Sequence, residues 1–397
     1  MPGAKPFTHL LGGMASWFLF WGTSQVMFQW LVTEHLASPP TLVGTAQMSL
    51  MLPSLVFLLV GGAVADRFDP KRMLLAVHLL AGLVSWGLWA LVVSRQLTYT
   101  WLIVYAVAIG TLQAFGMPAR DTQLSDVVRG GRMSRSVAGI TMVQHLSQMT
   151  GAFVGGAASL VGPGLVLAGQ ASFLLLGLLP VSRLPGRPER SEAPRRPLGL
   201  HEIRAGLIEV VRSPVLRPVL LLAMSTGTFF IGPFLVLLPL LVRDVYGGGA
   251  GEMGTLTAMF PLGAVIGGSV ILWRGGIERN GRALAIGQVL GAASIAAIGL
   301  GLPFEGSVAS VLVWGISGAL FINTGRTLFQ QNASEENRAR VLSVYTLGLL
   351  GASPFGSMLS GTLAGPLGLH GALLLAGAAA LLVVATLCAT TRLWSLR

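Results

Sequence analysis

The sequence predicts an all-α integral membrane protein in which twelve transmembrane helices form two halves of six. Three observations lead to this fold class. The chain of 397 residues is 53% hydrophobic and only 10% charged, whereas soluble proteins carry about 25% charged residues. Apolar runs of about 20 residues, the length that crosses a bilayer as a helix, recur along the whole chain. One long, polar and basic segment divides these runs into two equal sets.

The apolar runs supply the individual helices. Each run is expected to be helical throughout, because lipid offers backbone N–H and C=O groups no hydrogen-bond partner. Their approximate bounds, in chain order, are 10–33, 42–65, 73–94, 99–119, 136–160, 164–183, 215–242, 253–273, 283–303, 306–329, 340–364 and 368–391.

The polar segment between the sixth and seventh runs sets the domain boundaries. It predicts an N-terminal six-helix bundle over 1–183, a cytoplasmic linker over 184–214 and a C-terminal six-helix bundle over 215–397. The first half of the linker, residues 185–197, is rich in Pro and Arg. We expect this part to be disordered or extended.

The second half of the linker has the pattern of an amphipathic helix. Its apolar residues recur at helical spacing, at Ile203, Leu207, Val210 and Val211. Acidic and basic residues occupy the other faces. Such a helix is expected to lie on the inner leaflet of the membrane.

Basic residues are distributed very unevenly between the two sides of this topology. With the N-terminus in the cytoplasm, 24 of the 26 Lys and Arg residues fall on the cytoplasmic side, and only Arg95 and Arg243 fall on the other. This asymmetry follows the positive-inside rule. The formal charge of +11 therefore reports orientation and not nucleic-acid binding. Both termini and the linker are predicted to be cytoplasmic.

A short charged loop joins the second and third apolar runs. It reads G-x-x-x-D-R-x-D-x-K-R, with Gly62, Asp66, Arg67, Lys71 and Arg72 at the named positions. Its charges must lie at a membrane surface, because they are costly in hydrocarbon. The pattern resembles the signature loop between helices 2 and 3 of the major facilitator superfamily (MFS), with an Asp and a Pro where many members carry a Gly and a base. The resemblance implies twelve helices in two halves.

Internal repetition supports a two-halved chain. Three pairs of residues stand at one common spacing of 206 residues: Gly61 with Gly267, Arg120 with Arg326, and Arg132 with Arg338. Parallel repeats of this kind are typical of transporters whose substrate site lies between two halves. Further matches, at 30–32, 38–39, 118–120 and 213–216, resemble the MFS subgroup of drug and siderophore exporters that includes the enterobactin exporter and the macrolide efflux proteins.

The resemblance implies that the charged loop is a conformational latch. In the family its Asp, here Asp66, faces the N-terminus of helix 11, where a carboxylate complements free N–H groups and the helix dipole. That terminus corresponds to Asn337–Val341 in this chain. The loop bases are expected to pair with acids after helix 4, Asp121 and Asp126. The alternative is a solvated loop that only determines topology.

The substrate path is expected to be polar but scarcely charged. The candidates are amides within the apolar runs: Gln25, Gln29, Gln47, Gln113, Gln144, Gln148 and Asn323. Hydrogen bonding between neighbouring helices is the alternative role for each of them, worth roughly 0.6–2 kcal/mol per residue.

The candidates for proton coupling are His145 and Glu34. His145 lies about ten residues into the fifth run, so about 15 Å deep, and is taken as the ionisable group nearest the midplane. Ionisable groups at such depth are usually functional. The alternatives are a neutral imidazole bonded to a neighbouring helix, for example through Gln113, and a proton site at an interfacial carboxylate such as Asp66.

Enzyme signatures are absent from the sequence. It has no H-E-x-x-H zinc pair, no G-x-S-x-G elbow and no Walker A loop. We therefore expect no enzymatic activity, no cofactor and no metal. Without a nucleotide site, the energy for transport must come from an ion gradient or from the substrate's own gradient.

The resemblance and these residues together predict a secondary transporter of the bacterial inner membrane. The expected activity is proton-coupled export (antiport) of an amphipathic small molecule, a siderophore or a drug, by a monomer embedded in lipid. Helix 5 lacks the Gly-Pro pair that exporters of the superfamily often carry. An importer therefore stays open. A lysophospholipid flippase of the same fold and a sensor that binds ligand without moving it are further alternatives.

Overall fold

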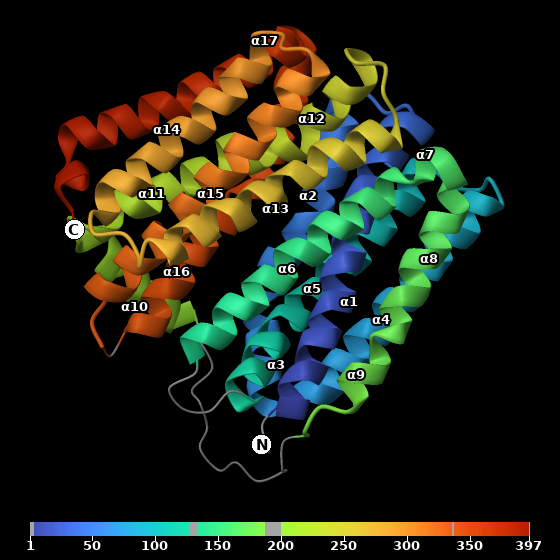
Figure 1. Cartoon of the computed structure of the whole chain (residues 1–397), viewed down its shortest axis with the longest axis horizontal. Coiled ribbons are helices and arrows are strands. Elements are labelled where there is room, and N and C mark those ends of the chain that lie inside the picture. The colour runs from blue at the N-terminus through green and yellow to red at the C-terminus, as the bar shows by residue number, and fades with distance from the viewer. Residues whose placement is uncertain (1–3, 128–132, 187–199, 336, 397) are drawn as a thin grey trace. The chain divides into compact units, whose positions relative to one another are not determined.

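The computed structural model describes the chain except for residues 1–3, 128–132, 187–199, 336 and 397 (Figure 1). Every regular element in the described residues is a helix, which confirms the all-α prediction. The extended first half of the linker was predicted for residues that lie almost wholly outside this description.

The described residues form two compact units, and each is presented by itself. The first comprises Met1–Val32, Ser49–Leu198 and Gly249–Gly254. The second comprises Thr33–Met48, Gly199–Gly248 and Thr255–Arg397. The second unit therefore includes a short piece of the N-terminal sequence, the turn after the first apolar run and the beginning of the next helix.

The first unit is built around helix α1 (Figure 1). This helix packs against α5, α6, α8 and α9, and α4 packs against α5 and α8. Small residues allow α1 and α6 to approach closely: a Cβ at Gly22 would overlap the carbonyl oxygen of Gln148, and one at Gly151 that of Leu19. The helices are α1 (Ala4–Trp30), α3 (Leu58–Arg67), α4 (Pro70–Val93), α5 (Tyr99–Val127), α6 (Met133–Gly156), α7 (Ala158–Val161), α8 (Pro163–Leu176) and α9 (Leu178–Ser182).

The second unit has its core between α10, α11 and α14 to α17. Leu216, Leu284, Phe329 and Val341 are fully buried there. Helix α14 packs against α15 and α17, and α10 packs against α16. The helices are α10 (Leu200–Arg212), α11 (Leu216–Thr226), η2 (Gly227–Ile231), α12 (Gly232–Asp244), α14 (Asn280–Gly299), α15 (Phe304–Asn332), α16 (Arg338–Gly351), α17 (Ser353–Thr390) and η3 (Leu393–Ser395).

Three helical elements contain residues of both units. They are η1 (Leu31–His35), α2 (Pro40–Val56) and α13 (Ala250–Trp273). The η1 segment and η2 are π-helical, a widened form that is frequent at functional sites. Segment η1 directly continues α1.

Eight segments in the described part of the chain are long and apolar enough to cross a membrane. One of them, Arg340–Thr390, has 51 residues, more than twice the roughly 20 that one crossing needs. Within it α16 gives way to α17 at Ala352, and Gly368 interrupts α17 with a φ of 69°. Glycine adopts this left-handed conformation without steric cost. The segment is therefore long enough for two crossings.

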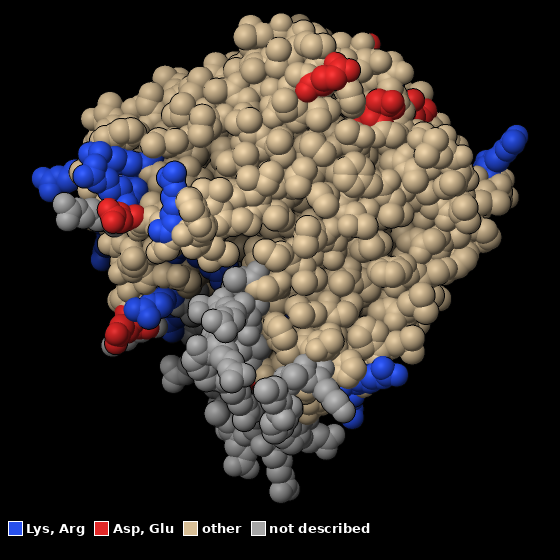
Figure 2. Space-filling model, in the orientation of Figure 1, with Lys and Arg blue, Asp and Glu red and all other residues tan. Residues whose placement is uncertain are grey.

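The surface of the described residues suits a lipid surrounding. Figure 2 shows a face on which acidic and basic side chains are sparse. Large apolar side chains are exposed on many helices, among them Leu160, Leu165, Trp273 and Leu382. Water would disfavour so much exposed apolar surface, whereas lipid accommodates it.

The charged loop is as short as the sequence predicted. Helix α3 ends at Arg67 and α4 begins at Pro70, so only Phe68 and Asp69 connect them. The Asp69 side chain caps α4 by accepting a hydrogen bond from the Lys71 N–H at 3.1 Å. Pro70 occupies the first helical position, which does not require an N–H donor.

The second half of the linker is helical, but its faces differ from the prediction. Val210 is fully buried in the core of the second unit and does not join an apolar face toward lipid. Leu207 and Val211 are exposed, together with Ile208. The side chain of Ile203 lies outside the described residues. Helical spacing alone does not reveal that α16 covers the Val210 side of the helix.

Candidate functional site

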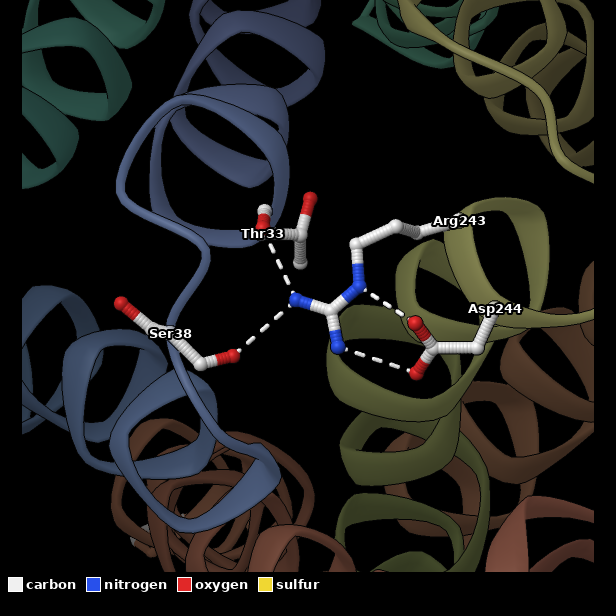
Figure 3. Close-up of polar contacts among 4 residues, drawn as sticks. All are labelled: Thr33, Ser38, Arg243 and Asp244. Atoms are coloured by element: carbon white, nitrogen blue, oxygen red, sulfur yellow. Dashed lines mark hydrogen bonds and ion pairs between the residues drawn. The ribbon is translucent and has the colours of Figure 1, made fainter.

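Arg243 donates four side-chain hydrogen bonds within the second unit, to Thr33, Ser38 and Asp244 (Figure 3). Its Nη1 donates to the main-chain carbonyl oxygens of Thr33 at 2.8 Å and Ser38 at 3.1 Å. Its Nε and Nη2 donate to the two carboxylate oxygens of Asp244 at 2.5 and 2.9 Å. A guanidinium carries five N–H donors, and Arg243 engages four of them.

The local backbone explains why an arginine is needed there. Thr33 lies in the last turn of the helix formed by α1 and η1, where carbonyl oxygens have no partner within the helix. Ala37 then takes a left-handed φ of 44°, and α2 begins at Pro40. A cation at a helix C-terminus also complements the helix dipole. Arg243 therefore clamps the 33–38 turn to the end of α12.

Glu34 completes what we call the Arg243 cluster: Glu34, Arg243, Asp244 and the carbonyl groups of Thr33 and Ser38. One carboxylate oxygen of Glu34, Oε1, is buried without a hydrogen-bond partner. Burial raises the pKa of Glu34; Arg243 opposes the rise and Asp244 adds to it. Asp244 pairs with Arg243 through both carboxylate oxygens, so Glu34 is left without a direct ion pair to this guanidinium among the hydrogen bonds of the described residues.

The candidate path residues of the first unit lie on helices that contact each other. Gln25 and Gln29 are on α1, Gln113 is on α5, and Gln144 and Gln148 are on α6, and α1 packs against both α5 and α6. Gln29 is buried, and the others are half-buried. Gln113 Oε1 is a buried atom with no hydrogen-bond partner.

His145 is half-buried on α6, the helix that also carries Gln144 and Gln148. Its ring contacts the side chain of Gln148 on the same helix, and its Nδ1 is buried without a hydrogen-bond partner. His145 is not the only histidine deep in the bundle: sequence reasoning overlooked His78, which is 2% exposed on α4. His78 differs because its ring already contacts the main chain, with Nδ1 2.8 Å from Leu74 O.

The other two candidate path residues lie in the second unit. Gln47 on α2 is buried, and its Nε2 has no hydrogen-bond partner. Asn323 on α15 is exposed, and its side chain donates to Ala319 O of the same helix at 2.7 Å.

The predicted latch residues are only partly described, because the side chain of Asp66 lies outside the described residues. Arg67, Arg72 and Asp121 are exposed, and Lys71 and Asp126 are half-buried. Gly62 is informative: a Cβ there would meet nothing within 4 Å, whereas a Cβ at the neighbouring Gly61 would overlap the Ala114 carbonyl oxygen. Packing in the first unit therefore explains Gly61 but not Gly62.

The N-terminal end of α16, the expected acceptor of Asp66, already binds a carboxylate. Glu209 of α10 accepts hydrogen bonds from Ser334 N at 2.9 Å, Ser334 Oγ at 3.1 Å and Asn337 Nδ2 at 2.8 Å. Desolvation, the largest single influence, raises the pKa of Glu209, but the three hydrogen bonds together outweigh it, so the net effect is a lowered pKa. Sequence reasoning assigned no role to Glu209.

A buried cation occupies the core of the first unit. Arg120 is 6% exposed, and its Cζ lies 4.8 Å from the ring centroid of Trp17 and 5.3 Å from that of Phe18. Aromatic faces stabilise such a charge electrostatically. In the described part of the chain, no three His, Cys, Asp or Glu side chains are grouped so that they could hold a metal ion.

Comparison with known proteins gives one family and a set of related folds. A family described as "Transmembrane secretion effector" matches residues 12–396. The enterobactin exporter EntS of Shigella flexneri is 32% identical over 222 residues, which are 53% of this chain and 49% of EntS. The match therefore spans about half the length of this curated relative.

Solved structures of membrane transporters share the fold. The nucleoside transporter NupG superposes with a TM-score of 0.73 at 14% identity, covering 97% of this chain and 98% of NupG. A POT family transporter in complex with 5-aminolevulinic acid gives 0.75 at 14% identity, covering 98% and 95%. A bacterial homologue of the human lysosomal transporter Spinster gives 0.70 at 14% identity, also covering 98% and 95%. At these identities the likeness concerns the fold alone.

Proposed function

Because the chain belongs to the transmembrane secretion effector family of the major facilitator superfamily, we propose that it is a proton-coupled antiporter that exports an amphipathic small molecule by alternating access. Members of this superfamily are multi-pass membrane transporters and not enzymes. A siderophore or a macrolide-like drug is the proposed substrate. Its partial identity to an enterobactin exporter supports both the substrate class and the outward direction.

The proposed topology has twelve transmembrane helices in two halves, 1–183 and 215–397, joined by the cytoplasmic linker 184–214. Both termini lie in the cytoplasm, and a monomer works in the bacterial inner membrane. The 24 to 2 distribution of basic residues supports this orientation. The length of the Arg340–Thr390 segment and the break at Gly368 support two crossings there.

The observation that carries the proposal is a pair of polar atoms without partners in the first unit. Gln113 Oε1 and His145 Nδ1 are both buried and lack hydrogen-bond partners. Such atoms cost free energy in a folded protein, and each requires a functional or solvent explanation. A donor group of the substrate would pair with Gln113 Oε1, and another polar group of the substrate would pair with His145 Nδ1, as acceptor or donor according to the protonation of the ring. The path amides of α1, α5 and α6 then recognise polar groups of the substrate.

Two groups are proposed to carry the coupling proton. His145 is the deeper one, and its ordinary pKa near 6.5 lets it titrate in the range of cellular proton gradients. Glu34 is the second, since its Oε1 is buried without a hydrogen-bond partner and burial raises the pKa of its carboxyl group. The two groups are alternative carriers, and an interfacial carboxylate such as Asp66 is the third candidate.

The charged loop is proposed to act as a latch that closes the cytoplasmic side. Its elements are Gly62, Asp66 and the bases Arg67, Lys71 and Arg72, with Asp121 and Asp126 as acidic partners. The open space beside Gly62 supports this role, because it leaves room for another part of the chain to approach. Asp66→Asn is expected to reduce transport while expression and folding stay largely intact. Unchanged flux and an unchanged balance of inward and outward states would reduce Asp66 to a topology signal.

Flux into inside-out membrane vesicles tests the proposal. An exporter in such vesicles moves substrate from the medium into the lumen, and a lumen more acidic than the medium drives the movement. We expect labelled siderophore or macrolide to accumulate when the lumen is acidified and to leak out when the gradient is collapsed. Vesicles with Gln113→Leu provide the matched comparison and should accumulate less.

Other outcomes of this assay identify the alternatives. Accumulation only in right-side-out vesicles indicates an importer. Movement of lysophospholipid between leaflets without solute flux indicates a flippase. Saturable binding without net movement in either orientation indicates a sensor.

A further inference from the structure

Helix α10 is attached firmly to the second unit along one face. A Cβ at Gly206 would come within 3.0–3.1 Å of Arg340 atoms, so the two helices lie in close contact. Val210 is fully buried in the shared core. Glu209 holds Ser334 and Asn337 through three hydrogen bonds. The side of α10 that faces the protein is therefore fixed.

The opposite face of α10 is apolar and exposed. Leu207, Ile208 and Val211 are 43%, 40% and 49% exposed. They recur at the three- and four-residue spacing of one helix face. Arg204 and Arg212, both exposed, lie on or beside the same face. Basic side chains around an apolar strip are typical of helices that lie in a membrane interface.

The position of α10 along the chain places it at the bilayer surface. Only residues 213–215 separate it from the membrane-crossing segment Leu216–Asp244. Its Gly206 also contacts Arg340, the first residue of the crossing segment Arg340–Thr390. A helix bound to the ends of two crossing segments cannot lie far from the lipid headgroups. The exposed apolar face is thus within reach of one leaflet.

We propose that α10 inserts Leu207, Ile208 and Val211 into the lipid of this leaflet and that Arg204 and Arg212 bind the headgroups of anionic phospholipids there. Arginine side chains extend toward headgroups while their stems stay in apolar surroundings. Anionic headgroups attract such juxtamembrane bases. Through Glu209, the leaflet then also holds the N-terminal end of α16. This surface does not depend on the substrate or its direction; only its assignment to the cytoplasmic leaflet rests on the proposed topology.

Fluorescence quenching in vesicles of defined composition tests this contact. Cys388, the only cysteine, is changed to Ser, and single cysteines at positions 207 and 211 are labelled with an environment-sensitive dye. The full-length protein is reconstituted into vesicles of phosphatidylethanolamine and phosphatidylglycerol. Nitroxide-labelled lipid is the quencher in the bilayer, and iodide is the quencher in water. A label at Glu335, an exposed residue in the loop before α16, is the aqueous control.

The proposal predicts that lipid nitroxide quenches the labels at 207 and 211 and that iodide quenches only the label at 335. It also predicts weaker lipid quenching in vesicles of neutral phosphatidylcholine, or in the double variant Arg204→Gln with Arg212→Gln.

Iodide quenching at 207 and 211 equal to that at 335 would overturn the lipid contact. Protection from both quenchers, with cross-linking between copies at 211, would show that a second copy covers the face. Equal lipid quenching in neutral vesicles would overturn the role of the two arginines. None of these readouts requires transport, so failure here is separate from failure of the exporter proposal.

Discussion

Loss of Arg243 should release the turn between α1 and α2. Arg243→Gln removes two hydrogen bonds to the main chain of Thr33 and Ser38. Hydrogen bonds from charged groups contribute about 1.5–3 kcal/mol each, so the pair is worth about 3–6 kcal/mol at most. The side chain is 22% exposed, and water replaces part of this interaction. We therefore expect a loss of about 2 kcal/mol, which is about 30-fold in the equilibrium for local opening.

The ion pair with Asp244 contributes much less to this clamp. Its side chains are 22% and 40% exposed, and exposed ion pairs are worth about 0–1 kcal/mol. Asp244→Asn is thus the matched control, with an expected change in local opening of at most about fivefold. Arg243→Lys keeps the charge but lacks the planar fork that reaches both carbonyl oxygens, so its effect should be intermediate.

The assay is the rate of thiol labelling at Ser38→Cys in a Cys388→Ser background. Ser38 is 4% exposed, and its substitution leaves the main-chain acceptor intact. Labelling should be slow with Arg243 present and should rise about 30-fold in Arg243→Gln, as the opening equilibrium predicts. Equal rates in Arg243→Gln and Asp244→Asn, in protein that still elutes as a folded monomer, would refute the clamp.

Three further predictions follow from the same geometry. Gly61→Ala should destabilise the protein by about 1–3 kcal/mol, because its Cβ overlaps a main-chain carbonyl. Gly62→Ala should leave the melting temperature unchanged or slightly raised and still reduce flux. Equal losses of stability in the two variants would contradict the latch role of Gly62. His145→Gln should preserve transport down a substrate gradient and abolish accumulation driven by a pH gradient; an unchanged pH profile would place the proton site elsewhere. The pKa of Glu209 is lowered below its ordinary 4.5 in the folded protein. Its contribution to stability is therefore present above pH 4.5 and is lost as the pH falls through the folded pKa. Thermal unfolding measured across this pH range should show this loss of stability in the wild type but not in Glu209→Gln.

The sequence was sufficient for the parts of the fold that depend on periodicity and local chemistry. Apolar runs predicted helices, and the charged loop predicted the short connection that the structure has at Phe68 and Asp69. These features arise from residues close together in the chain. The orientation of α10 could not be predicted in the same way. Its spacing defined an amphipathic helix, but only the packing of α16 shows that Val210 faces inward.

The Arg243 cluster was missed for a related reason. The acceptors of Arg243 are main-chain carbonyl oxygens 205 and 210 residues away in the sequence. Every residue has a main-chain carbonyl oxygen, so no sequence motif identifies the ones that accept these hydrogen bonds. A signal was nevertheless present, since in the proposed topology Arg243 is one of only two bases assigned to the non-cytoplasmic side. A base at such a position is expected to have a specific partner in the folded protein.

The role of Glu209 on α10 could not be predicted from the sequence either, because its partners are distant in the chain. Its partners Ser334 and Asn337 are 125 and 128 residues away. In the sequence it is one of several charged residues on the polar side of an amphipathic helix. The structure distinguishes it because three donors converge on its carboxylate.

Proton movement caused by the substrate is the most direct test of the central claim. The purified protein is reconstituted into vesicles that contain a pH-sensitive dye, and an acidic lumen is imposed. Addition of substrate to the medium should raise the luminal pH in vesicles with inside-out protein, because each exported molecule is exchanged for outgoing protons. The response should be absent in empty vesicles and in His145→Gln. Substrate accumulation without any change in luminal pH, or a change in pH that is independent of substrate, would contradict proton-coupled export.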